Sequence, residues 1–256
     1  MNKIATTHLE IPRDFQIACE GFGIMVPDFM QLLVDHFSYA YVFISDDSVN
    51  ELATQAFLHA ERVILDPQPL LKTNITLGKV AKESLPLIKK IVHLGMNKNY
   101  SRKIKKEKAS KLVDKLYEVC SKEIAFKPCL YFDEETKIVL NNDFLLYCAI
   151  HQYTPTLMLN AYMRCVSLAD LYARNHLDKI VPNPALAFYL KVRNAYGNLI
   201  DEKHINTLGF KNFLLDLQEF RFRYFTVRDL ERRTALYRER FEHNFNQINQ
   251  YNYGED

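Results

Sequence analysis

A dense run of basic residues is the part of this sequence whose residue types and spacing best fit a definite chemistry. The segment NKNYSRKIKKEKASK, residues 97–111, carries seven lysines and arginines and a single acid, Glu107. Lysine and arginine side chains at this density bind nucleic acids with little dependence on nucleotide sequence, because binding releases the counterions condensed on the phosphates. Tyr100, within the run, suits stacking on a base. We therefore predict phosphate binding by Lys98, Arg102, Lys103, Lys105, Lys106, Lys108 and Lys111.

Positive charge is concentrated around this run. From Lys89 to Lys115, ten basic residues oppose two acids, which gives a net charge of +8. Because the whole chain of 256 residues carries +2, the remainder carries −6. The alternative interpretation is a solvated linker that leads into the polar face of a helix over 107–122, where apolar residues recur at helical spacing.

An alternating segment and two helical patterns lie near the start of the chain. Residues 4–11 alternate between apolar and polar, which predicts a strand with Thr6, His8 and Glu10 on its polar face. Pro12 suits the first turn of a helix. Helical spacing follows over 15–22 and again, after the glycines of GFG, over 27–37.

The stretch THLEIPRDF, followed by EGFGIMVPDFMQLLVDHF, resembles the ribbon-helix-helix family of DNA-binding proteins over residues 4–41. The resemblance implies a homodimer whose two paired strands lie in the major groove of DNA. It also implies that Thr6, His8 and Glu10 face the bases and that the amides near 26–28 approach a phosphate. The alternative is a strand that packs on the helical body of its own chain.

Near the end of the chain, Arg238 and His243 fit an R-x4-6-H pattern. This spacing resembles that of the HEPN ribonucleases, which are all-α, and the resemblance implies RNA cleavage by these two residues. Arginines between 221 and 240 are interleaved with acids. Asp229 and Arg233, four residues apart with the acid first, favour a surface helix stabilised by ion pairs.

The sequence gives no support for a metal site or a cofactor. None of the eight histidines forms an HxH or HExxH motif, and none of the five cysteines forms a CxxC pair. GxGxxG and GxxxxGK[ST] loops are also absent from the sequence. We expect no cofactor and no metal, and we interpret the cysteines as buried free thiols in a reducing compartment.

Local signals predict mainly helices. Only 7 glycines and 9 prolines occur, and two β-prone runs around the acidic turn DEETK predict a hairpin at about 127–140. SVNE, from Ser48, has the form of a capping box. Further predicted helix starts are at Thr154-Pro155, Asn183-Pro184 and Thr226.

The predicted fold class is mainly α, a multi-helix body with a short N-terminal strand and one hairpin. Residues 66–78, with two prolines and a terminal glycine, are the predicted linker between a strand-helix-helix-helix unit (1–65) and a helical domain (79–256). No run is apolar enough to span a membrane and no signal-peptide pattern is present. We therefore predict a cytoplasmic protein that does not associate with membranes.

The leading hypothesis is a non-enzymatic DNA-binding protein, either a transcriptional regulator or an accessory factor for mobile DNA, that dimerises through its N-terminal strand. A second hypothesis is a helical protein–protein interaction module, in which aromatic faces bind a protein partner and the basic segment is only solvated. The third is a HEPN-like ribonuclease that uses Arg238 and His243.

Overall fold

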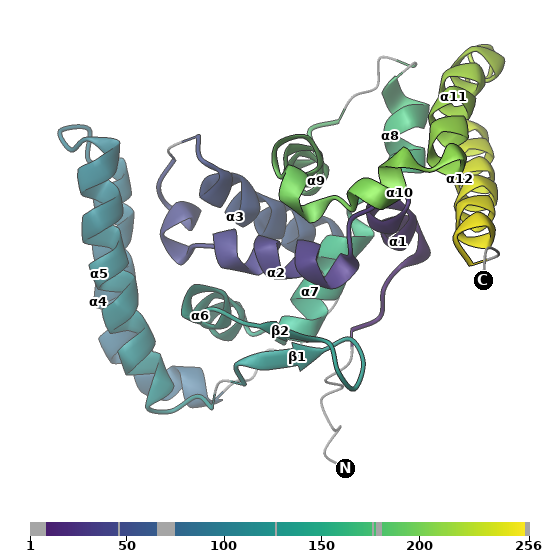
Figure 1. Ribbon diagram of the computed structural model, residues 1–256. Helices are drawn as coiled ribbons and strands as arrows, with labels where there is room; N and C mark the ends of the chain where they lie inside the picture. Colours follow the sequence, from purple (N-terminus) through teal and green to yellow (C-terminus); the bar gives the residue numbers. More distant parts are fainter. Residues whose placement is uncertain are drawn as a thin grey trace. The chain divides into compact units, whose positions relative to one another are not determined.

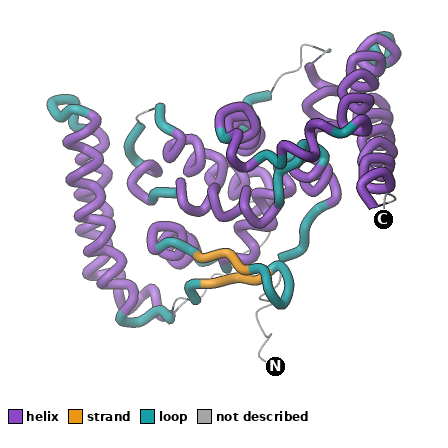
Figure 2. Tube along the Cα trace, in the orientation of Figure 1, coloured by secondary structure: helices purple, strands orange, loops and turns teal. Residues whose placement is uncertain are grey.

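The computed structural model describes residues 9–45, 47–65, 75–125, 127–175, 177 and 181–253. The described chain is mainly α-helical, as predicted, and its strands form one short antiparallel hairpin (Figure 2). Two compact units make up the chain, one from residues 1–10 and 30–162 and the other from 11–29 and 163–256. The predicted linker at 66–78 lies largely outside the described residues, and the division it implies stays a prediction.

The first unit contains the hairpin and a long pair of helices. In Figure 1, α4 and α5 run antiparallel, joined by a short loop. One boundary between the units lies between residues 10 and 11, and the other two fall inside α2 (Val26–His36) and α7 (Pro155–Arg164). Between these helices come η1 (Tyr39–Val42), α3 (Val49–Ala60), η2 (Glu61–Leu65), α4 (Ile75–Met96), α5 (Arg102–Ser121), β1 (Cys129–Tyr131), β2 (Lys137–Val139) and α6 (Asn142–His151).

Polar side chains begin several of these helices where the sequence predicted. Ser48 Oγ accepts the Glu51 amide at 3.2 Å, and the Glu51 carboxylate in turn accepts the amide of Asp47 at 2.6 Å. Thr154 Oγ1 likewise accepts a hydrogen bond from the Leu157 amide at 3.2 Å. Each bond satisfies an amide that the first helical turn leaves without a backbone partner.

The predicted hairpin is also confirmed. Leu130 pairs with Ile138, and both side chains are buried. Asp133 closes the acidic turn, because its Oδ1 accepts the amides of Glu135 at 2.9 Å and Thr136 at 2.6 Å. The carboxylate therefore forms the turn, as aspartate commonly does.

Aromatic rings fill the core of the first unit. Phe57 contacts Phe37, Phe144 and Tyr162 with ring centroids 5.4, 4.9 and 5.7 Å apart. All four side chains are almost completely buried. The abundance of phenylalanine and tyrosine is thus explained here by packing.

The second unit is assembled from both ends of the described chain. Phe29 contacts Phe15 and Phe188 at centroid distances of 5.7 and 5.9 Å, and the Tyr189 hydroxyl donates to the Ala18 carbonyl. Its helices are α1 (Arg13–Glu20), α8 (Leu168–Asn175), α9 (Pro184–Ala195), η3 (Gly197–Leu199), α10 (Glu202–Asn206), α11 (Leu208–Arg223) and α12 (Leu230–Tyr253).

The final helix begins later than predicted, and one of its arginines is not on the surface. Asp229 Oδ1, not Thr226, caps α12 by accepting the Arg232 amide at 2.7 Å. Arg233 is 0% exposed; its Nη1 donates to the Val227 carbonyl at 3.1 Å, whereas Nε and Nη2 have no hydrogen-bond partner among the described residues. The expected ion pair between Asp229 and Arg233 is therefore replaced by a helix cap and a buried guanidinium.

We expect Arg233→Met to stabilise the protein by about 1 kcal/mol or more, because a buried cation with unsatisfied donors is more costly than an apolar side chain of similar length. Urea denaturation of the variant and the parent measures the difference. Arg232→Met, at the exposed neighbouring position, is the control and should change stability little. A large loss of stability in Arg233→Met would contradict this account.

Candidate nucleic-acid interface

The basic segment forms the loop between α4 and α5 and the first turns of α5. Ser101 caps α5 by accepting the Ile104 amide at 3.4 Å, so the helix begins at Arg102, five residues before the expected start. Lysine and arginine are good helix formers, which permits this earlier start. Residues 102–111 of the basic run therefore belong to a helix, and residues 97–101 form the loop before it.

Electrostatics at this helix end are unusual. Acidic residues are favoured in the first turn, where the helix dipole is positive. The first turn of α5 has no acid, and basic residues follow in succession from Arg102 to Lys108, interrupted only by Ile104 and Glu107. Positive side chains thus add to the positive end of the dipole, which concentrates attraction for an anion.

Three of the seven predicted phosphate-binding residues have side chains that are both exposed and without a partner in the described part of the chain. The side chains of Lys98, Lys103 and Lys111 are exposed and make no hydrogen bond or ion pair with the described part of the chain. Their ammonium groups therefore contact an approaching polyanion without first breaking an internal interaction.

The loop between α4 and α5 and the first turns of α5 form the tip of this helix pair. The other four predicted residues hold this tip in place. Arg102 pairs with Asp47 at 2.9 Å, and Lys105 Nζ donates to the Gly95 carbonyl at 2.7 Å. Lys106 lies over the Tyr41 ring at 5.7 Å, and Lys108 over the Tyr100 ring at 4.0 Å. Tyr100, expected to stack on a base, thus has a lysine on one face.

Gly95, near the end of α4, allows the tip to dock closely. A Cβ atom at this position would lie 2.2 Å from the Phe43 carbonyl oxygen. The backbone of α4 at Gly95 therefore lies directly against the backbone of the segment after η1. Any residue with a Cβ atom at this position would force one of the two segments to move.

The predicted base-facing residues are mostly not described. Thr6 and His8 lie outside the described residues, and Glu10 is exposed without regular secondary structure. Leu9 is buried, and its amide donates to the Tyr131 carbonyl of the same chain at 3.2 Å. At this end of the predicted strand, the backbone is engaged by β1 of its own chain, as in the alternative interpretation.

Arg238 and His243 both lie on α12, and whether they act together stays a prediction. Asp14 binds Arg238 Nε at 3.0 Å and Nη2 at 3.1 Å, and it also accepts the Ser167 hydroxyl at 2.8 Å. The hydrogen bond to Asp14 raises the pKa of Arg238. His243 is exposed on the same helix. Arg238 therefore joins α1 to α12 in the second unit.

A polar cluster that sequence reasoning missed lies in the first unit. Glu61, the first residue of the π-helical turn η2, accepts hydrogen bonds from the Tyr147 hydroxyl and from His151 Nδ1, the latter at 2.8 Å. π-Helical turns often occur at functional positions. No local spacing in the sequence indicates this pair, because His151 and Glu61 lie 90 residues apart.

Burial alone would raise the pKa of Glu61, but the hydrogen bonds from His151 and Tyr147 and the charge of Arg62 bring it below its usual value. A carboxylate with a lowered pKa in the folded state stabilises the fold above its unfolded pKa, near 4.5. This stability is lost as the pH falls through the folded pKa.

We expect Glu61→Gln to be less stable than the parent by about 1–2 kcal/mol at pH 7, because charge-assisted hydrogen bonds are replaced by neutral ones. This difference in the free energy of unfolding should stay constant above about pH 5 and become smaller below pH 4.5. Chemical denaturation across pH 3–8 measures it, with exposed Glu118→Gln as the control. A gap that does not change with pH would contradict the assigned role of the Glu61 carboxylate.

Within the described residues, no three His, Cys, Asp or Glu side chains are grouped closely enough to share a metal ion. Among the described helices, none combines the length and apolarity needed to cross a bilayer. All five cysteines are free; four are buried and Cys129 is partly exposed. Comparison with known proteins finds no matching family model, curated protein or solved structure.

Proposed function

We propose that this chain is a non-enzymatic DNA-binding protein that contacts the phosphate backbone through the tip of the α4–α5 pair. The observation that carries the proposal is the accumulation of basic side chains at the N-terminus of α5, with three lysines whose side chains have no partner among the described residues. Self-repulsion at this helix end disfavours folding, and a bound polyanion removes it.

The anchored residues add to this surface. The ion pair between Arg102 and Asp47 is exposed on both sides, and exposed pairs contribute little stability. Replacement of Asp47 by a phosphate as the ionic partner of Arg102 therefore costs little stability. The predicted ribbon residues are not needed for this element, which binds phosphates and does not read bases.

Titration of the protein into a labelled mixed-sequence DNA duplex tests the proposal by fluorescence anisotropy at several salt concentrations. With three to four phosphate contacts, we expect log Kd to change with log salt with a slope of about 3. An affinity that is independent of salt, or absent at low salt, would overturn the proposal. Preference for an RNA duplex under the same conditions would assign the surface to RNA instead.

An exposed apolar stripe on α11 supports a second candidate function, helical protein–protein interaction. Leu208, Leu215 and Phe222 recur every seven residues and are 74%, 63% and 81% exposed. Apolar side chains at heptad spacing favour the pairing of two helices. The simplest occupant is α11 of a second copy, a dimer surface other than the N-terminal strand that the sequence predicted.

Light scattering after size-exclusion chromatography tests this candidate. The parent should form dimers at high concentration, and Leu215→Glu with Phe222→Glu should remain monomeric. A parent that is monomeric at every concentration would exclude self-association through α11. DNA binding by the double variant should be retained, because the basic tip belongs to the other unit.

A further inference from the structure

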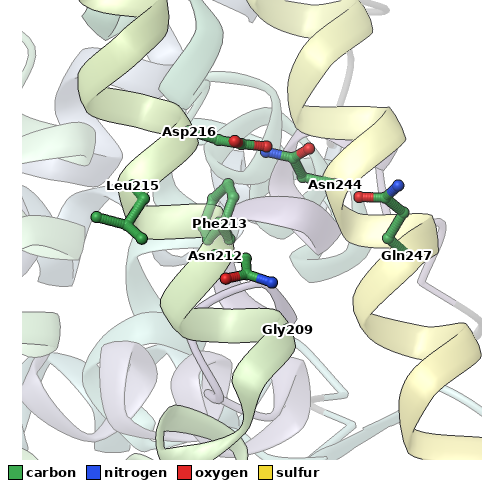
Figure 3. Close-up of a pocket in the computed structure, with 7 residues that line it drawn as sticks. All are labelled: Gly209, Asn212, Phe213, Leu215, Asp216, Asn244 and Gln247. Carbon is green, nitrogen blue, oxygen red and sulfur yellow. The ribbon is translucent and has the colours of Figure 1, made fainter.

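A groove between α11 and α12, within the second unit, has the properties of a small-molecule site. Its volume is about 310 Å³, at the lower end of the range for ligand pockets. Figure 3 shows its residues, with Asp216 and Asn244 directed toward each other and Leu215 directed away from α12. The groove is lined by Gly209, Asn212, Phe213, Leu215 and Asp216 of α11 and by Asn244 and Gln247 of α12.

Asn244 is the unusual member of this lining. Its side chain is 2% exposed, and neither Nδ2 nor Oδ1 has a hydrogen-bond partner among the described residues. A buried polar atom without a partner typically costs about 1–3 kcal/mol, and native proteins leave few of them. Because the amide has no hydrogen bond to break, it can turn toward a ligand at little cost.

The charge in the groove is balanced. The Asp216 carboxylate pairs with Arg240 Nη2 at 2.7 Å, and the Arg240 guanidinium lies over the Phe220 ring at 4.3 Å. With its negative charge compensated, Asp216 still accepts hydrogen bonds from a neutral ligand. An anion gains little here, because the Arg240 guanidinium beside Asp216 already has a carboxylate partner.

The polar groups specify the edge of the ligand. A carboxamide presents one donor and one acceptor side by side, which matches the adjacent donor and acceptor of a nucleobase such as adenine. Asn212 and Gln247 are exposed at the rim and repeat this chemistry. Phe213 supplies an apolar wall for a planar ring.

We propose that this groove binds a neutral planar heterocycle with adjacent hydrogen-bond donor and acceptor, a nucleobase, with Asn244 as its main polar contact. The proposal is independent of the phosphate-binding tip, which belongs to the other unit. Loss of binding at one surface therefore leaves the other unaffected.

Isothermal titration of the full chain with free adenine tests the proposal, and a single-stranded oligodeoxyadenylate tests whether the base is taken from a nucleic acid. We expect saturable adenine binding that Asn244→Leu weakens about tenfold or more, since the loss of paired hydrogen bonds is worth at least about 1.4 kcal/mol. Leucine is close in size and removes the unsatisfied amide, so this variant should fold. Gln218→Leu, an exposed change on α11 outside the groove, is the matched control.

Three results would overturn the proposal. The first is no heat of adenine binding at millimolar concentration, in which case water alone satisfies Asn244. The second is equal adenine affinity of the Asn244→Leu variant and the parent. The third is equal affinity of the parent for adenine and for indene, which has a similar fused-ring shape but no hydrogen-bonding groups.

Discussion

Replacement of Lys98, Lys103 and Lys111 by glutamate is expected to abolish binding to duplex DNA. Each of these side chains is exposed and has no internal partner among the described residues, so the fold does not depend on it. The change turns three attractive contacts into three repulsive ones, in the loop before α5, in its first turn and further along the helix. Loss of about three phosphate contacts lowers affinity by about two orders of magnitude or more at moderate salt.

A matched variant separates this local effect from bulk charge. Lys191, Lys203 and Lys211 are exposed residues of the second unit, and their replacement by glutamate changes net charge by the same amount. Fluorescence anisotropy with one duplex should show near-normal binding by this control. Equal losses in the two triple variants, or normal binding by the first, would show that the α5 tip is not the phosphate-binding element.

Gly95→Ala is expected to lower the free energy of unfolding by about 2 kcal/mol. Alanine normally stabilises a helix by about 1 kcal/mol relative to glycine. Here its Cβ would lie 2.2 Å from the Phe43 carbonyl oxygen and 3.1 Å from the carbonyl carbon, so one backbone segment must move. Overpacking of this kind typically costs about 1–3 kcal/mol, occasionally more, and it also disturbs the bond from Lys105 to the Gly95 carbonyl.

Gly197→Ala is the control for the glycine change, because a Cβ there would meet no atom within 4 Å. Thermal and urea denaturation of both variants measure the difference. A Gly95→Ala protein as stable as the parent, or more stable, would show that the close approach to Phe43 is not a structural requirement.

Local structure was largely predictable from the sequence, because its causes are local. Ser48, Thr154 and Asn183 cap helices in the expected way, and the acidic turn at Asp133 closes a hairpin. The prediction for α12 was wrong because two residues suited to capping, Thr226 and Asp229, lie three positions apart. Aspartate is the better N-cap of the two, and Asp229 accepts the Arg232 amide, so the helix starts at Leu230.

The candidate sites were less predictable, because they depend on contacts across the chain. The basic run was visible as composition, but which lysines have internal partners follows from the positions of Asp47, Tyr41 and Gly95. The bond between Glu61 and His151 and the burial of Arg233 have no signature in residue spacing. The groove that includes Asn244 likewise joins helices whose contact only the folded chain defines.

The second unit combines residues 11–29 with residues 163–256, so it cannot be completed until the end of the chain has been synthesised. Arg13 binds Glu242, its partner 229 residues later, at 2.6 Å. At ribosomal rates of about 5–20 residues per second, the interval between synthesis of α1 and synthesis of α12 is on the order of ten to fifty seconds. During that interval Phe15 and Ile17 lack part of their final packing, and transiently exposed apolar surface of this kind is prone to aggregation.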